Sequence, residues 1–333
     1  MTTGELQQKL FKLIKSKMAE NIPLAEEIAT LLNISTDSAY RRIRGEKTVT
    51  IDELQTLCVH YKVSLDQLME IKAGGVVFYG QYMDKKTFTF EDYLNSVIQS
   101  LTYMNSFKEK TFYYSCKDLP IFHHYHIREI AAFKRFFWLK TYFQFPEFER
   151  KKFRFDDHPE SLFVLEQKVL DLYNQLPCVE IWNLESMNIF FRQIEFYRDG
   201  QVFESDEDVY RLYEAIGNLW AHLEKQAALG YKFNYGDPKQ KKISDFKMFF
   251  NEVLLGDNNM LVELDGMKIS YVSHTTINFM FTNDEGFNNN MYQQLQNQMK
   301  RSTLISEVSE KERSRFFRII REKIENRKKG LNL

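Results

Sequence analysis

A short turn between two helical patterns near the N-terminus constrains the fold more than any other feature of this sequence. Residues 24–32, LAEEIATLL, have the apolar spacing of a helix. Asn33 tolerates the left-handed conformation of a helix end, and Ser35 is suited to cap a further helix over residues 36–44. Gly45 then ends that helix. Two helices separated by about three residues are typical of a helix-turn-helix.

Further helix signals lie on both sides of this pair. An opening helix is predicted from an apolar stripe of Leu6, Leu10, Leu13, Ile14 and Met18. Two capping boxes, Thr50 with Glu53 and Ser64 with Gln67, precede the helical runs IDELQTLCVHY and LDQLM. The sequence therefore predicts a domain of five short helices over residues 1–70.

The ordered string EEIATLLNISTDSAYRRIRGEKTVTIDELQTLCVHYKVSLDQLM resembles the phage-repressor (Cro-like, XRE) helix-turn-helix, of a type seen in regulators from Bacteroidetes. The resemblance covers about a fifth of the chain and implies a bacterial DNA-binding transcriptional regulator. Two positions differ from the family pattern. Ala25 replaces a glutamine that binds phosphate in many members, and Ile43 replaces an acidic residue.

Helical spacing divides the residues of the third helix into an inner and an outer set. Ala39 and Ile43 form its apolar pair and are predicted to face the core. In a helix-turn-helix, the N-terminal half of this helix enters the major groove of double-stranded DNA. We therefore predict base contacts from Thr36, Tyr40 and Arg41, and phosphate contacts from Ser38, Arg42, Arg44, Lys47 and Thr48.

Two observations favour more modest interpretations of the arginines. Arginines on an exposed helix usually form only a solvated face, and Asp37 would repel phosphate.

Residues 1–72 contain ten basic and ten acidic side chains, so the segment has no net charge. A neutral domain that binds DNA through one face should bind weakly alone, which favours a homodimer on a two-fold site.

The length and composition limit the remaining possibilities. A chain of 333 residues with 44% apolar residues is expected to form two or more domains. The net charge is −1, so any affinity for nucleic acid must come from a local patch. The three cysteines are far apart in sequence, and no secretory signal or membrane-length apolar run occurs. These features predict a soluble, cytoplasmic protein without a membrane partner.

After the first domain the pattern changes. Residues 71–87 contain paired glycines and no helical period, and we predict a linker there. Residues 88–235 have aromatic-rich helical patterns, and residues 243–333 combine β-rich runs, separated by GDNN and DG turns, with two closing helices. The fold class predicted for the chain is mainly α, with a small antiparallel sheet near the C-terminus. Ser309 and Glu312 form a further predicted capping box.

By analogy with one-component regulators, residues 88–333 are predicted to sense an unknown small-molecule or protein effector, or to dimerise. The alternative is a protein-interaction or signalling module whose helix-turn-helix no longer binds DNA. No nucleotide-binding or hydrolase motif is present, so we expect neither an enzyme nor a cofactor. Weaker site candidates are the HHYH run at 123–126, DDHPE at 156–160, His274, and a basic C-terminal helix, for which simple packing is the more favoured explanation.

Overall fold

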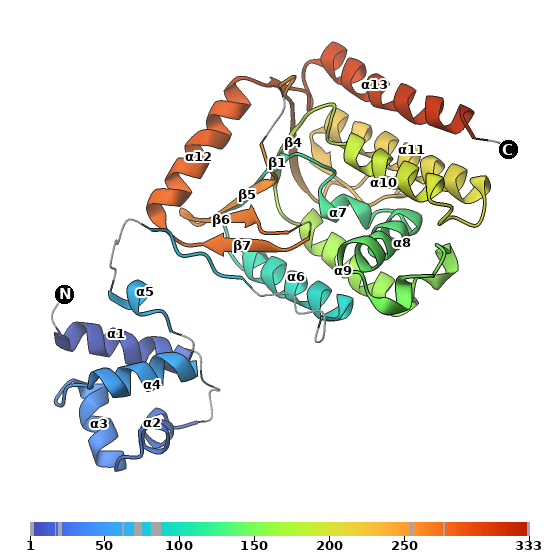
Figure 1. Cartoon of the computed structure of the whole chain (residues 1–333). Helices are drawn as coiled ribbons and strands as arrows, with labels where there is room; N and C mark the ends of the chain where they lie inside the picture. The colour runs from blue at the N-terminus through green and yellow to red at the C-terminus, as the bar shows by residue number, and fades with distance from the viewer. Residues whose placement is uncertain are drawn as a thin grey trace. The chain divides into compact units, whose positions relative to one another are not determined.

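The computed structural model describes residues 3–16, 18, 22–61, 63–69, 75–80, 88–253, 256–275 and 277–331. The chain divides into two compact units, Met1–Gly75 and Val76–Leu333 (Figure 1). Residues 76–80 therefore belong to the second unit, although the sequence placed them in a linker. The remainder of that linker, apart from Gly75, lies outside the described residues.

The described part of the first unit contains five helices, as predicted. They are α1 (Thr3–Ser16), α2 (Leu24–Leu32), α3 (Thr36–Arg44), α4 (Ile51–Tyr61) and α5 (Leu65–Met69). Each helix contributes to one small hydrophobic core, which includes Leu10, Ile14, Ile28, Ala39, Leu57 and Leu68. The apolar spacing read from the sequence is thus the spacing that buries one face of each helix.

The predicted end signals of α2 and α3 are present. Asn33 has φ 52° and Gly45 has φ 84°, so both helices end in the left-handed conformation. The Ser35 side chain accepts a hydrogen bond from the backbone N–H of Ser38 at 3.3 Å. Thr50 and Glu53 form the reciprocal capping box, at 3.3 and 3.0 Å. The side chain of Gln67, in the other predicted box, lies outside the described residues.

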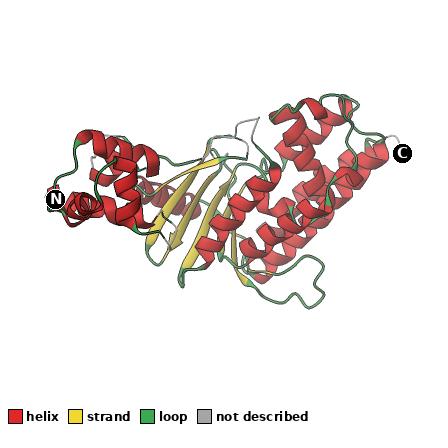
Figure 2. Cartoon of the chain, turned by 90° about the horizontal axis from the view of Figure 1, so that it is seen from below, coloured by secondary structure: helices red, strands yellow, loops and turns green. Residues whose placement is uncertain are grey.

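The predicted fold class is wrong for the second unit, whose described residues form one large mixed sheet of eight strands. The strand order is β3-β4-β2-β1-β5-β6-β7, and β8 also pairs with β4. The strands are β1 (Lys110–Cys116), β2 (Cys178–Trp182), β3 (Tyr231–Lys232), β4 (Ser244–Phe250), β5 (Asn259–Leu264), β6 (Met267–Ser273), β7 (Phe279–Thr282) and β8 (Thr303–Leu304). Figure 2 shows these strands side by side, with helices against the sheet.

The sequence analysis missed β1 and β2 because their surroundings remove the usual strand signal. Both lie within residues 88–235, where only helices were predicted. Strand β2 pairs in parallel with β1 on one side and with β4 on the other, and all five of its residues are buried. A parallel strand covered on both faces has no alternation of polar and apolar residues. CVEIW therefore has no period of two.

The antiparallel part of the sheet was predicted more successfully. Strands β5, β6 and β7 form an antiparallel meander. The DG signal is the turn between β5 and β6, where Asp265 has φ 45° and Gly266 has φ 86°, as a tight hairpin turn requires. GDNN is not a hairpin turn, because β4 and β5 are separated in the sheet by β2 and β1.

Helices cover both faces of the sheet, but unequally. One face is covered by α6 (Phe90–Asn105), α7 (Ile121–His124), α8 (Arg128–Phe137), α9 (Glu160–Asn174), α10 (Asn188–Asp199), α11 (Asp206–Leu229) and α13 (Glu310–Lys329). The crossovers β1–β2 and β2–β4 advance in the same direction, so connections of one hand place their helices on one face. Only α12 (Glu285–Lys300), among the described helices, packs on the opposite face, through Met291 and Leu295.

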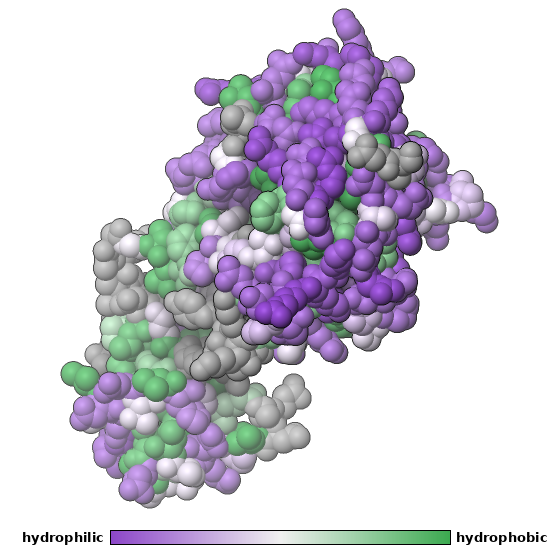
Figure 3. Space-filling model, turned by 45° about the vertical axis from the view of Figure 1, so that its right-hand side comes forward, coloured by the Kyte–Doolittle hydropathy of each residue, from purple (hydrophilic) through white to green (hydrophobic). Residues whose placement is uncertain are grey.

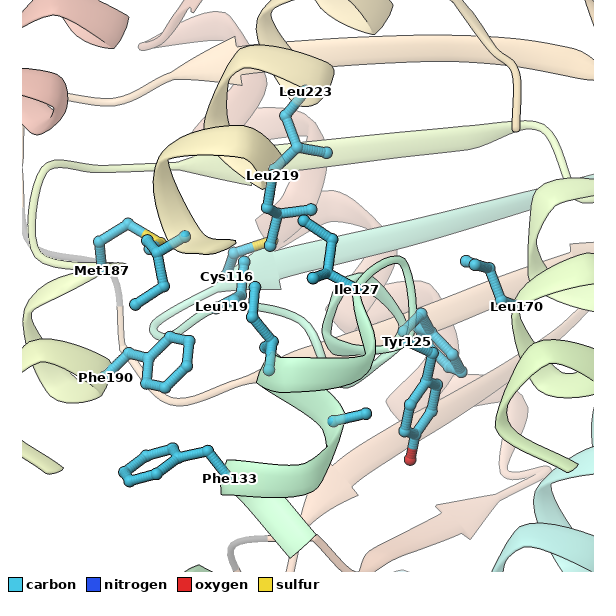
Figure 4. Close-up of a cluster of buried hydrophobic side chains, with 14 of the residues drawn as sticks. Cys116, Leu119, Tyr125, Ile127, Phe133, Leu170, Met187, Phe190, Leu219 and Leu223 are labelled. Atoms are coloured by element: carbon cyan, nitrogen blue, oxygen red, sulfur yellow. The ribbon is translucent and has the colours of Figure 1, made fainter. Parts of the chain in front are cut away.

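The large hydrophobic core lies between the sheet and the seven helices that cover one of its faces. Figure 4 shows side chains from several elements gathering there, among them Cys116 of β1, Phe133 of α8, Phe190 of α10 and Leu219 of α11. A π-helical turn, η1 (Trp138–Tyr142), and two 3-10 turns, η2 (Pro146–Phe148) and η3 (Phe155–Asp157), connect α8 to α9. The unusually high content of phenylalanine and tyrosine is thus used to fill the space between the sheet and seven helices.

The predicted cap at the start of α13 is not present in the structure. Ser309 has φ 56° and its side chain makes no capping hydrogen bond, so the predicted box with Glu312 is wrong. A left-handed residue points its side chain away from the position needed to cap the following turn.

Hydrophilic residues cover most of the visible face of the second unit (Figure 3). None of the described helices is long and apolar enough to cross a membrane.

Candidate functional site

The buried inner face of helix α3 determines which of its side chains point outward. Ala39 is fully buried and Ile43 packs against the same core. The side chains of Arg41 and Arg44 are therefore 54% and 64% exposed. We define the recognition surface as the exposed residues of α3 and the following loop that the sequence also selected: Thr36, Tyr40, Arg41, Arg44, Lys47 and Thr48.

Arg42 does not belong to this surface, which corrects its prediction as a phosphate contact. It is only 4% exposed. Its guanidinium donates to both carboxylate oxygens of Glu53, at 2.9 and 2.6 Å, and to the Ser38 hydroxyl at 2.7 Å. Position 42 follows Ala39 by three residues, so it lies on the buried side of the helix. The Ser38 hydroxyl accepts a hydrogen bond from Arg42 and can still donate its own proton, so its predicted phosphate contact stays a prediction.

Glu53 connects α4 to α3, the helix that carries most of the recognition surface. One of its carboxylate oxygens accepts from Arg42 and also from the backbone N–H of Thr50. The hydrogen bonds from Arg42 lower the pKa of Glu53, against the opposing effect of burial. This carboxylate therefore stays ionised at neutral pH, caps α4 and fixes α3 to it.

Gln7 is a positioning residue that the sequence analysis did not select. Its buried side-chain amide donates to the backbone carbonyls of Arg42, at 2.6 Å, and Lys47, at 2.8 Å. Its oxygen accepts from the backbone N–H of Val49 at 3.0 Å. These three bonds hold the loop after α3 against α1. A polar residue within the apolar stripe of the first helix was the signal that could have identified it.

The electrostatics of the recognition surface are mixed. Arg41 and Arg44 both lie near Glu46, at 3.9 and 3.5 Å between nitrogen and oxygen. The Arg44 guanidinium also lies 5.8 Å from the centre of the Tyr40 ring. Exposed ion pairs of this kind are weak, so Glu46 competes only modestly for the two arginines. The surface therefore offers two exposed guanidinium groups, hydroxyls and an aromatic ring to an anionic partner.

The HHYH run lies inside the second unit. His123, His124 and His126 are all buried, and no cluster of metal-ligating side chains occurs in the part of the chain that is described. His123 Nε2 lies 3.0 Å from both oxygens of Glu180, which also accepts from Tyr173 and from Trp182 at 2.8 Å. This arrangement is a buried hydrogen-bonded cluster around Glu180 at the centre of the sheet.

Two buried histidines close to this cluster remain neutral. Burial lowers the pKa of His222 to about 3 and that of His126 well below its ordinary value. Their ring centres are 4.7 Å apart. Burial alone would raise the pKa of Glu180, but the nearby charge of His123 and the hydrogen bonds from His123 and Tyr173 hold it below its usual range.

The other weak candidates are explained by packing. In DDHPE, the His158 ring lies 2.8 Å from buried Glu166, so it joins the core. The basic C-terminal helix α13 buries Phe316 and Ile320, and its cations pair with the neighbouring helices. Arg327, for example, donates to Glu195 at 2.8 Å. His274 lies in the loop after β6, where its backbone N–H donates to Asn278 at 2.9 Å.

Comparisons with protein-family models, with curated proteins and with solved structures found no match to this chain.

Proposed function

We propose that this protein is a DNA-binding transcriptional regulator that acts in the cytoplasm as a homodimer. The first unit would read double-stranded DNA through the recognition surface. The second unit would sense an effector or join the two copies. The observation that carries the proposal is the pair of capped helices α2 and α3, which exposes Tyr40, Arg41 and Arg44 on one side.

The arrangement of α3 supports different roles for its three arginines. Arg41 lies on the outer face and has the donors needed to bind guanine through two hydrogen bonds. Arg44, Lys47 and Thr48 lie at the end of α3 and in the following loop, where they can reach phosphate groups. Arg42 contributes indirectly, because its bonds to Glu53 fix the orientation of the helix.

Dimerisation follows from the small number of cations available. The first unit has no net charge, and only Arg41, Arg44 and Lys47 among the described cations lie on the recognition surface. Three cations release few counterions, so one copy should bind weakly at physiological salt. Two copies on a two-fold site would double these contacts. Light scattering of the purified chain tests this directly, and a strictly monomeric protein on its DNA would contradict it.

The DNA proposal is tested by selecting bound fragments from a random-sequence duplex library and titrating the enriched fragment at several salt concentrations. The wild-type chain should bind with an affinity that falls as salt rises. The Arg41→Ala/Arg44→Ala double variant should bind much more weakly. Arg318→Ala is a matched control, since Arg318 is equally exposed at 62% but lies on α13 in the second unit. Equal binding by all three proteins would refute the assignment.

One observation favours a second candidate function, a protein-interaction module that has lost DNA binding. Glu46 lies within 4.0 Å of both exposed arginines, and Asp37 adds a further carboxylate to α3. These carboxylates would oppose a phosphate backbone but suit a protein partner of mixed charge. No enrichment of any DNA fragment by the wild-type chain would favour this alternative.

A further inference from the structure

The second unit contains a cavity of about 670 Å³ between α6 and the sheet. Its walls come from α6, from β5–β7 and from the segment at Tyr79–Gly80. Small-molecule sites in proteins commonly measure about 300–1,000 Å³. The cavity is therefore large enough for a ligand of ordinary size, and the described residues that line it all belong to one unit.

The floor of the cavity is apolar and belongs to the buried core. Leu101 and Met104 of α6, Phe112 of β1, Phe122 of α7 and Met260 of β5 line it, and each is at most 6% exposed. Such a floor binds the apolar body of a ligand by removing it from water. It offers no charged partner.

The mouth of the cavity is polar, and the charged side chain among its described residues is an aspartate. Thr89, Asp92, Ser96 and Ser100 of α6 recur at helical spacing along it. Asp92 accepts a hydrogen bond from the Thr89 hydroxyl at 2.6 Å and is exposed at the rim. Among the described residues that line the cavity, none is a lysine, arginine or histidine. The described part of the lining thus offers one carboxylate and several hydroxyls, and no counter-ion for an anion.

We propose that this cavity binds an amphipathic amine, a molecule with an apolar body and one cationic nitrogen. The body would lie on the floor formed by Met104, Phe112 and Met260. The ammonium group would lie at the mouth, where Asp92 and the hydroxyls of Ser96 and Ser100 accept its hydrogen bonds. Carboxylate or phosphate amphiphiles would place their charge beside Asp92 and bind less tightly.

The position of Tyr79 suggests how such a ligand would act as an effector, a role that rests on the proposed function. Tyr79 forms a backbone bridge with Phe281 of β7, at 2.7 and 2.8 Å, and both residues line the cavity. Tyr79 is also only four residues from the end of the first unit at Gly75. A ligand that contacts this bridge therefore contacts the segment through which the chain enters the second unit.

The test measures binding of three probes to the full-length chain without DNA, by displacement of the uncharged dye Nile red. Decylamine, decanol and decanoate share one apolar chain and differ in the charge of the head. We expect decylamine to bind roughly five-fold or more tightly than decanol, and decanoate to bind most weakly. Equal affinity for decylamine and decanoate would overturn the proposal.

Two pairs of variants locate the site. Asp92→Asn should remove the advantage of decylamine over decanol, whereas Glu91→Gln, on the neighbouring exposed carboxylate, should retain it. Ser96→Phe should weaken all three probes about ten-fold by filling the mouth, whereas Asn95→Phe should not, since Asn95 does not line the cavity. Calorimetric unfolding of each variant establishes that it is folded. Unchanged probe affinity in Ser96→Phe would contradict the assignment.

The outcomes separate this inference from the DNA proposal. Decylamine binding that is lost in Ser96→Phe supports the site even if no DNA fragment is bound. A change in DNA affinity on adding decylamine, absent in Ser96→Phe, would support the effector role as well. If Ser96→Phe alters only the oligomeric state and leaves probe affinity unchanged, the cavity is an interface between copies and the proposal fails.

Discussion

Replacement of Arg42 by alanine should destabilise the first unit, although sequence reasoning would treat this residue as a surface contact. The guanidinium is buried and makes four hydrogen bonds, two to Glu53 and two to Ser38. Removing one partner of a buried ion pair costs about 3–5 kcal/mol. Because Glu53 is itself 17% exposed, we expect the lower end of that range, about 3 kcal/mol.

Hydrogen exchange of the full-length chain measures this effect by segment. A loss of about 3 kcal/mol corresponds to roughly 100-fold faster exchange, since each 1.4 kcal/mol is a factor of ten. The acceleration should be confined to α1–α4, and amides of β1 and β2 in the second unit should be unaffected. Exchange in the second unit of the same molecule thus serves as the control for exchange in the first unit.

Arg44→Ala is the matched control. Arg44 is an arginine of the same helix, but its side chain is 64% exposed and its partner Glu46 is 3.5 Å away at the surface. Exposed pairs of this kind contribute about 0–1 kcal/mol, so exchange should rise by less than about five-fold. Equal acceleration in Arg42→Ala and Arg44→Ala would refute the conclusion that Arg42 is a structural residue.

Three further predictions test the other buried polar groups. The pKa of Glu53 is lowered in the folded state, so its stabilising effect is present above its ordinary pKa and is lost as the pH falls through the lowered value. In Glu53→Gln, the stability of the first unit, followed by its amide signals, should therefore change less between about pH 6 and pH 3 than in the wild type. Gln7→Ala should cost about 1–3 kcal/mol by leaving buried backbone groups without partners, measured by exchange in the loop after α3. Glu180→Gln, which removes the buried carboxylate bonded by His123, Tyr173 and Trp182, should lower the thermal midpoint of the second unit by about 10 °C. The fluorescence of the three tryptophans, which all lie in that unit, reports the transition.

The parts of the fold that depend on local signals could be predicted from the sequence. Asn33, Ser35 and Gly45 act on their own backbone or on that of the next few residues, so their types alone locate the ends of α2 and α3. The same holds for Asp265 and Gly266, whose positive φ angles form the β5–β6 turn. Each of these residues does in the structure what its type implies.

The parts that depend on distant partners could not be predicted. CVEIW becomes a strand because β1 and β4 lie on either side of it. The paired residues are 66 positions apart for Cys116–Trp182 and 68 positions apart for Cys178–Phe246. Arg42 was placed with its neighbouring arginines because its charge was considered before its helical phase. Ser309 matched a capping pattern, but its left-handed backbone conformation, invisible in the pattern, removes the cap.

The central claim is that the recognition surface binds DNA, and the salt dependence of binding tests it most directly. The logarithm of the binding constant for the selected fragment should fall linearly with the logarithm of salt concentration, and each lost phosphate contact should reduce the slope by about 0.9. We predict that the Arg41→Ala/Arg44→Ala variant binds at least about ten-fold more weakly, with a shallower slope. The same affinity and the same slope for the variant and the wild type would contradict the claim.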